Sequence, residues 1–410
     1  MGLNLSEINW YNAVLELVRK SIGTSNGEFE FNNLSEQDWQ DIAKETFAQT
    51  MGLMCFDAAC SVRSNIPKSI YDEWFKRTLR LTANGVKNAA GQEKLVKLLT
   101  ENNIPYVILK GASSAHYYPN PDKRASGDVD FIVNPDDVEK TKKLMLETGY
   151  ILERESNPVH YELDYENVRF ELHKKISGLP EDRNAREIFA AELENIVSMG
   201  EMCDAGFVKP CDYHHGIVIF LHIMHHMLSN GIGARQLCDW ACFVTKTHEK
   251  DFWREKMIPL LKKTGTFVFA SAITEACVHY LNVPKPSWHD TVSDELRDSV
   301  INEIYSSGNF GRKNPSNNSY INLMVVKNSK KLTMFGKIAK MARSLHNSNK
   351  TVFPIIEKAP YLYPFIMIYR ILRHIVFIIR GKRPSLLKVS QQADARNKIF
   401  MKYKLYETEK

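Results

Sequence analysis

Two acidic residues with one residue between them are the first feature of the sequence that could do chemistry. Asp128 and Asp130 flank Val129 at the start of the apolar segment Phe131–Val133. In an extended strand, residues i and i+2 point to the same face, so the two carboxylates would lie side by side. Like charges this close repel each other, and a divalent cation is the simplest partner that offsets the repulsion. Carboxylate oxygens are the ligands that Mg²⁺ prefers.

A later segment, residues 168–173, supplies a third acid. The same alternation places Glu171 and His173 on one face of this predicted strand. If the strand pairs beside the first one, three carboxylates converge and can hold two metal ions, as in enzymes of phosphoryl and nucleotidyl transfer. We therefore predict that Asp128, Asp130 and Glu171 are catalytic residues and ligands of Mg²⁺, with Mn²⁺ as the alternative metal.

A lysine and a glycine stand upstream of the acids. Lys110 and Gly111 end the apolar run Tyr106–Leu109, and 16 residues separate the glycine from the first acid. A glycine lets the backbone approach a triphosphate, and a helix that starts there offers N–H groups and a positive dipole. Ser113 would add a hydroxyl, and Arg124 would clamp a phosphate oxygen. Each residue alone suits an ordinary strand-to-helix turn, but together with the acids they predict a nucleotide site.

The order of a Lys-Gly turn, an Asp-x-Asp strand and a later Glu resembles the polymerase-β-type nucleotidyltransferase superfamily. More narrowly, roughly residues 70–300 resemble a bacterial family of uncharacterised nucleotidyltransferases. The segments that carry this likeness are Leu109–Ser113, Arg124, Gly127–Phe131, Phe170–His173, His222–His226 and Arg235–Asp239. At the turn, this chain has Gly111-Ala112-Ser113 where the superfamily usually has Gly-Gly or Gly-Ser.

The resemblance implies a metal-dependent enzyme that moves a nucleoside monophosphate from an NTP to an acceptor and releases pyrophosphate. It assigns nucleotide binding to Lys110, Gly111, Ser113, Arg124 and His173. The acceptor would be a small molecule, a glycan, a protein or tRNA. Two alternatives stay open. One is a catalytically inactive nucleotide-binding scaffold or antitoxin-like partner, and the other is a metal phosphohydrolase.

Two segments after the third acid have side chains that suit a cleft. The His-rich segment Tyr213–Leu228 is expected to be a buried helix lining the site. It has no H-E-x-x-H pattern, which argues against zinc. Arg235 and Asp239 are four residues apart on a second predicted helix, and the simplest interpretation is an ion pair along that helix.

The elements that must position these residues predict an α+β fold with a small mixed sheet flanked by helical regions. Strands are expected at 104–109, 128–133, 150–154, 159–164 and 168–173, the last two as a hairpin, and a helix at 111–118. The expected regions are an N-terminal helical region (1–101), a nucleotidyltransferase αβ core (102–176), a helical region lining the cleft (177–305), and a loop with a basic helical tail (306–410).

Composition narrows the class of protein. The chain has 410 residues, of which 44% are hydrophobic and 25% charged, as in a soluble globular protein. Its seven Cys are scattered and lack C-x-x-C pairs, which argues against a disulfide framework and against a Cys-rich zinc site. The N-terminus has no signal-peptide pattern. We therefore expect a cytoplasmic protein.

The C-terminal fifth of the chain is strongly basic. Residues 331–410 carry 17 Lys and Arg against 4 Asp and Glu, whereas the whole chain has a net charge of only +6. Such a tail suits nucleic acid, another phosphate-rich partner or an anionic membrane. Within it, residues 353–384 are strongly apolar, but Arg370 and Arg373 interrupt the run and disfavour a transmembrane helix. We expect this segment to pack on the core; an interfacial membrane helix or a partner-binding helix is the alternative.

Overall fold

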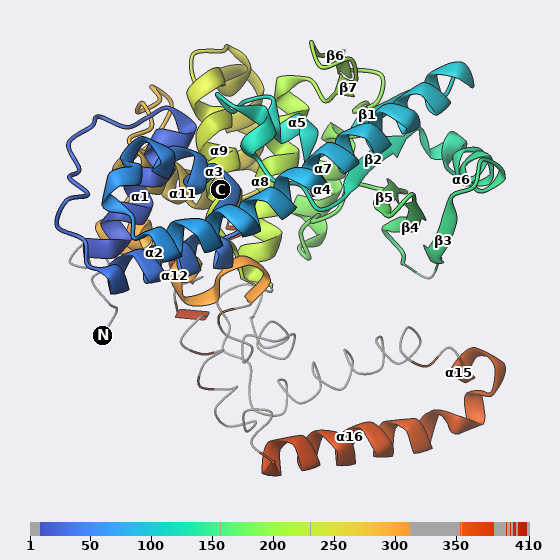
Figure 1. Cartoon of the computed structure of the whole chain (residues 1–410). Coiled ribbons are helices and arrows are strands. Elements are labelled where there is room, and N and C mark those ends of the chain that lie inside the picture. Colours follow the sequence, from blue (N-terminus) through green and yellow to red (C-terminus); the bar gives the residue numbers. More distant parts are fainter. Residues whose placement is uncertain are drawn as a thin grey trace.

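The computed structural model describes residues 9–155, 157–229, 231–311, 313, 353, 355–380, 391, 394, 397, 398 and 401–407. It is mostly helical with a five-stranded mixed sheet, which confirms the predicted α+β class (Figure 1). Most of the loop predicted at 306–320 lies outside the described residues. The four-region division of the chain stays a prediction.

Four helices precede the sheet: α1 (Asn9–Ile22), α2 (Glu36–Ala48), α3 (Gly52–Ala59) and α4 (Lys68–Glu101). The sheet and its connections contain β1 (Tyr106–Ile108), α5 (Ala112–Ala115), β2 (Val129–Val133), α6 (Val138–Glu147), β3 (Ile151–Arg154), β4 (His160–Tyr165) and β5 (Val168–His173). After it come α7 (Arg183–Glu192), β6 (Glu201–Met202), β7 (Val208–Lys209), α8 (Asp212–Leu228), α9 (Ala234–Thr247), α10 (Ile258–Lys263), α11 (Phe267–Leu281) and α12 (Asp294–Ser307). The last described helices are α15 (Ile355–Lys358) and α16 (Tyr363–Ile379).

The sheet has the order β1-β2-β5-β4-β3. β2 and β5 are parallel, whereas the other neighbouring pairs are antiparallel. All five predicted strands are therefore present. The predicted hairpin is also confirmed, and its turn residues Glu166 and Asn167 have positive φ angles of 48° and 59°. Positive φ at both central residues is what a type I′ turn requires.

The two faces of the sheet differ in polarity because side chains alternate along each strand. One face carries Val129, Phe131 and Phe170, which join a buried apolar cluster with residues of α4 and α6. The opposite face carries Asp130 from β2 and Glu171 from β5, paired directly across the two parallel strands. Asp130 and Glu171 thus lie on the face opposite this cluster.

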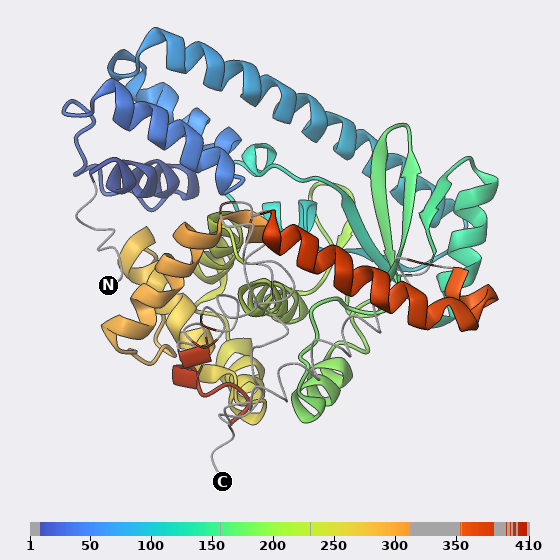
Figure 2. The ribbon, with the colours of Figure 1, turned by 90° about the horizontal axis from the view of Figure 1, so that it is seen from below.

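The 34-residue helix α4 connects the helical region to the sheet (Figure 2). Its first half contributes Ile70 and Trp74 to one hydrophobic core, and its last turns contribute Leu95 and Leu99 to the core beneath the sheet. The helix is continuous although it contains Gly85 and Gly91. At Gly91 the absence of a side chain allows close packing, because a Cβ there would lie 3.1 Å from Val168.

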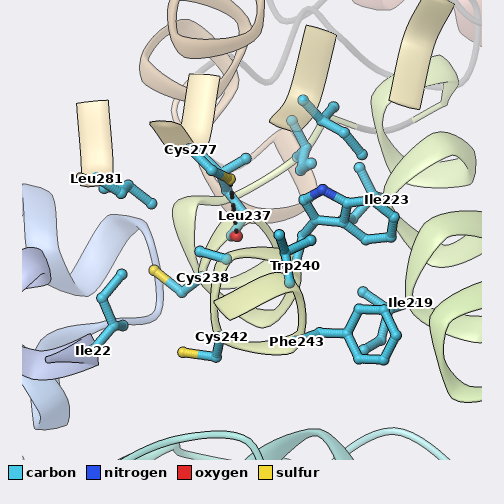
Figure 3. Close-up of a cluster of buried hydrophobic side chains, with 14 of the residues drawn as sticks. Ile22, Ile219, Ile223, Leu237, Cys238, Trp240, Cys242, Phe243, Cys277 and Leu281 are labelled. Carbon is cyan, nitrogen blue, oxygen red and sulfur yellow. Dashed lines mark hydrogen bonds between the residues drawn. The ribbon is translucent and has the colours of Figure 1, made fainter. Parts of the chain in front are cut away.

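The core that contains Ile70 and Trp74 also surrounds α9, which lies among α1, α8 and α11 (Figure 3). Leu237, Cys238, Trp240, Cys242 and Phe243 project from several sides of α9 into this core and are almost completely buried. Cys277 of α11 donates a weak hydrogen bond from Sγ to the Leu237 carbonyl, at 3.8 Å. This packing fixes α9 firmly, and its Arg235 and Asp239 make hydrogen bonds to the segment between α5 and β2.

Two expectations about helices need correction. The helix after the Lys-Gly turn is only the four-residue α5, because the chain turns away again before Pro119. Helix α16 does not bury its apolar residues in the core, since Phe365, Leu372 and Ile379 are 69%, 56% and 78% exposed. No helix among the described residues is both long and apolar enough to cross a membrane.

The contact at Gly91 gives a first testable prediction. Gly91→Leu should lower the free energy of unfolding by about 2 kcal/mol, because the added side chain would collide with Val168 and Phe170 of the sheet. Gly85→Ala is the matched control, since nothing lies within 4 Å of a Cβ at Gly85. It should raise stability by roughly 0.5–1 kcal/mol through helix propensity. Urea denaturation of both variants tests this, and equal stabilities would contradict it.

Candidate active site

The Lys110–Gly111 bend is a backbone feature that only glycine satisfies well. Gly111 has φ +54° and ψ −111°, in a region that L-residues rarely adopt. A Cβ at this position would also lie 3.0 Å from Ser126 Oγ. The bend ends the strand and lets the Lys110 side chain turn toward β2, where its Nζ lies 2.8 Å from Asp130 Oδ1.

Asp130 is the most tightly held of the three acids. Its carboxylate is buried and also lies 2.9 Å from His173 Nε2. Burial acts to raise the pKa of Asp130, but the Lys110 charge and the His173 hydrogen bond outweigh it and hold the pKa well below its usual range. Burial acts to lower the pKa of His173, but the hydrogen bond to Asp130 outweighs this effect, and the pKa of His173 is raised. Asp130 is therefore ionised, with Lys110 and His173 as its partners.

Asp128 is in the opposite electrostatic situation. Burial and the neighbouring Asp130 charge raise the pKa of Asp128 to about 6. Among the described residues, none forms a hydrogen bond or ion pair with its carboxylate within normal distances. Its backbone is held firmly all the same: Ser126 Oγ donates to the Asp128 carbonyl at 2.9 Å. Asn88 and Arg235 donate to the preceding carbonyls of Ser126 and Ala125 at 3.0 and 2.8 Å.

Glu171 lies beside Asp130 in the parallel ladder and also contacts two histidines. Its Oε2 lies 3.5 Å from both His173 Nε2 and His160 Nδ1. His160 is directly opposite His173 across the β4–β5 hairpin. His160 was not among the predicted site residues. The predicted hairpin contained the signal, because its register places His160 and His173 as a cross-strand pair.

The three predicted acids lie near one another, but the closest group of potential metal ligands includes only one of them. Within the described chain, the three metal-ligating atoms that lie within 4.8 Å of one another belong to His160, Glu171 and His173. Asp130 reaches this set through His173, and the Asp130 and Glu171 charges both act on Asp128. Carboxylates with imidazoles beside them fit a divalent cation. The Asp128 carboxylate, which has no hydrogen-bond or ion-pair partner among the described residues, is the observation that most favours one.

Arg124 and Asp239 form a buried ion pair that supports the bend. The Nε and Nη2 atoms of Arg124 lie 2.7 Å from the two Asp239 oxygens, and its Nη1 donates to the Gly111 carbonyl at 3.1 Å. The Tyr118 hydroxyl also donates to Asp239, at 2.7 Å. The interpretation of Asp239 as the partner of Arg235 along α9 was therefore wrong, because Asp239 pairs with the loop and Arg235 bonds the Ala125 carbonyl instead.

Ser113 is placed less favourably for a nucleotide than expected. Its side chain is fully buried, and its hydroxyl donates to the Ile108 carbonyl at 2.6 Å. Arg124 likewise uses its guanidinium within the protein. The structure thus gives both residues contacts that stabilise the turn, and their contacts with a phosphate stay predictions.

The His-rich helix α8 borders the site. The rings of His222 and His226 lie 4.4 Å apart, with the Lys110 charge acting on both. Burial, reinforced by the neighbouring His225 and Lys110, lowers the pKa of His226 to about 3. The pKa of His222 is lowered well below its usual value, again chiefly by burial. Both imidazoles are therefore neutral near pH 7 and add no positive charge to the site.

The buried Arg124–Asp239 pair predicts a large cost when one partner is neutralised. Asp239→Asn should lower the free energy of unfolding by about 3 kcal/mol, because it leaves the buried guanidinium without a counter-charge. Asp298→Asn is the control: Asp298 pairs with Arg297 at the same 2.7 Å, but its side chain is 39% exposed. That variant should lose less than about 1 kcal/mol. Similar losses in both variants, measured by urea denaturation, would argue against a buried pair.

The raised pKa of Asp128 predicts the pH dependence of stability. Because the folded protein binds the Asp128 proton more tightly than the unfolded chain, ionisation costs stability above about pH 6. Asp128→Asn should therefore stabilise the metal-free protein by about 1 kcal/mol at pH 7 to 8, a figure discounted for partial exposure. The gain should shrink as the pH falls from about 6 to about 4. Thermal unfolding in EDTA across this range measures it; a gain that grows toward low pH would contradict the assignment.

Comparison with known proteins agrees with this geometry. A family model described as uncharacterised nucleotidyltransferase matches residues 35–282, from the start of α2 to the end of α11. The matched region contains every predicted site residue, which confirms the resemblance inferred from the motifs. A comparison with curated proteins found no match. The chain therefore belongs to this family of uncharacterised nucleotidyltransferases.

Proposed function

We propose that this protein is a Mg²⁺-dependent nucleotidyltransferase that moves a nucleoside monophosphate from an NTP to a hydroxyl or phosphate acceptor and releases pyrophosphate. The observation that carries the proposal is the pairing of Asp130 with Glu171 across β2 and β5, with Asp128 two residues before Asp130. Family membership supports an NTP as the donor. The acceptor is expected to be a small molecule, a glycan, a protein or tRNA.

In this proposal Asp128, Asp130 and Glu171 hold the metal, with Mn²⁺ as the alternative to Mg²⁺. When bound, such a metal lowers the pKa of the acceptor hydroxyl and neutralises the triphosphate and the departing pyrophosphate. Hydrogen bonding from His173 orients the Asp130 carboxylate and keeps it ionised. A side chain that fixes a metal-ligating group in this way typically matters for affinity as much as the ligand itself.

Lys110 and Gly111 serve the nucleotide in this proposal. The positive φ of Gly111 permits the tight bend after Lys110, and the backbone N–H groups of this bend would contact a phosphate. Lys110 supplies a positive charge beside the acids, and the Asp130 charge, working against burial, raises its pKa so that it stays protonated. Its ammonium group can therefore neutralise phosphate charge without a change of protonation.

Two other functions have one observation each in their favour. The close set of His160, Glu171 and His173 favours a metal phosphohydrolase, because imidazole ligands suit Zn²⁺ and Mn²⁺ better than Mg²⁺. The internal hydrogen bond of Ser113 and the ion pair of Lys110 with Asp130 favour an inactive nucleotide-binding scaffold. Their products differ: a hydrolase releases phosphate without an acceptor, and a scaffold releases nothing.

The test is Asp130→Asn, assayed by calorimetric titration with each NTP in Mg²⁺ and by pyrophosphate release. The metal supplies several kcal/mol of stabilisation, so loss of one ligand should reduce turnover at least about 100-fold and weaken Mg·NTP binding. The control is Asp164→Asn, near the turn of the β4–β5 hairpin that carries Glu171. There the acid pairs with Arg169 on the surface. It should behave as wild type.

Each outcome of this test distinguishes the candidate functions. Unchanged Mg·NTP binding and turnover in Asp130→Asn would refute the site. Binding by the wild type without pyrophosphate release, tested against cell fractions as the source of acceptor, would identify the scaffold. Phosphate release that needs Zn²⁺ or Mn²⁺ and is lost in His160→Ala would identify the hydrolase.

A further inference from the structure

Helix α16 has an unusual distribution of side chains between its two sides. Phe365, Ile368, Leu372 and Ile379 follow one another at intervals of three, four and seven residues, which places them on one face of the helix. All four are exposed, by 56% to 78% of their surface. The flanking Tyr369 and Val376 are exposed as well. The solvent-facing side of α16 is thus a continuous apolar strip.

The opposite side of α16 carries its half-buried residues, among them Tyr363, Met367, Arg370 and Phe377. A surface helix of a soluble protein normally buries its apolar stripe and exposes its charges. Here the exposed strip is apolar, and Arg370 lies on the side that is partly covered. An exposed contiguous apolar strip of this kind marks a surface that another body covers.

The charges around the strip indicate what that body is. Helix α16 contains no acidic residue, while exposed Arg373 and Arg380 lie along the edge of the strip. Lys382, Arg383 and Lys388 follow in the sequence, within the tail of 17 Lys and Arg against 4 Asp and Glu. A complementary surface must therefore offer an apolar region to the strip and negative charge to the arginines beside it. A leaflet of anionic phospholipid has this composition.

The length of the helix decides its orientation on such a leaflet. The 17 residues of α16 extend over roughly 25 Å, which is less than the apolar thickness of a bilayer. The helix is therefore suited to lie in the plane of the interface with the strip in the acyl region. Tyr361 and Tyr369, 75% and 52% exposed, add the amphipathic rings that favour the headgroup level. Figure 1 shows α16 at the lower margin of the molecule, where a flat surface can reach it.

We propose that α16 binds the protein peripherally to anionic phospholipid membranes, through the apolar strip Phe365, Ile368, Leu372 and Ile379 and the arginines beside it. This inference does not rest on the proposed enzymatic activity. It concerns residues outside the region that the family model matches, so it adds a property that family membership does not supply.

The test is flotation of the full-length protein with vesicles of phosphatidylcholine, with and without phosphatidylglycerol. The wild type should bind only the vesicles that contain phosphatidylglycerol, and binding should weaken as the salt concentration rises. Ile368→Asp/Leu372→Asp should reduce binding about tenfold or more, since both side chains face solvent and their replacement places charge in the acyl region. Arg373→Glu/Arg380→Glu should reduce it as well.

The matched control is Val86→Asp, a substitution of an equally exposed apolar residue, 66% exposed, on α4. It should leave vesicle binding unchanged. Thermal unfolding of each variant checks folding, and because the replaced side chains are exposed, all melting temperatures should agree. Equal binding to both kinds of vesicle, no binding by the wild type, or wild-type binding by Ile368→Asp/Leu372→Asp would overturn the proposal. So would a wild-type dimer, seen by light scattering, that this double variant dissociates without any vesicle binding.

Discussion

The parallel pairing of β2 with β5 is the constraint on which the candidate site depends. These strands are distant in the sequence, and only their register brings Asp130 and Glu171 next to each other. The register itself is set by the other face of the sheet, where Val129, Phe131 and Phe170 must point into the apolar core. A shift by one residue would turn the acids into this apolar core and move its apolar residues to the opposite face. The stability of the core therefore also positions the chemistry.

The charges of the site are balanced unevenly. Asp130 has both Lys110 and His173 as partners, whereas Asp128 is raised in pKa by burial and by its neighbour. A folded protein retains such a destabilised carboxylate at a cost, and sites that bind or react are where this cost is commonly found. The cations nearby do not remove the imbalance: Lys110 and Arg235 act to lower the pKa of Asp128, but burial and the Asp130 charge outweigh them. The neutral histidines of α8 add no charge either.

Much of the site was predictable from the sequence because the signals were local. The alternation in Asp128–Val133 and Val168–His173 gave the strands and the face on which the acids lie, and the turn at Glu166–Asn167 gave the hairpin. The contacts of Arg124 were not predictable. A local rule pairs Asp239 with Arg235, four residues away, but the folded chain offers a buried arginine 115 residues away. His160 was overlooked although the predicted hairpin contained it.

The exposure of α16 could not be predicted from the sequence either. Its composition indicated a helix that would pack on the core, because apolar residues usually do. Which residues of a helix meet solvent depends on the surface against which it lies, and the sequence of the helix does not contain that surface. The correct interpretation needed the exposed fraction of each side chain.

Helix α4 has a mechanical consequence for how substrates reach the acids. Its two ends are anchored in different cores, with Trp74 in the helical one and Leu99 beneath the sheet. A continuous helix of this length resists bending, so it acts as a strut that fixes the spacing between the two bodies. A wide jaw-like opening of the sheet away from α8 and α9 would require this strut to break or unseat. We therefore expect substrates to enter and leave through rearrangements of loops and side chains around the acids.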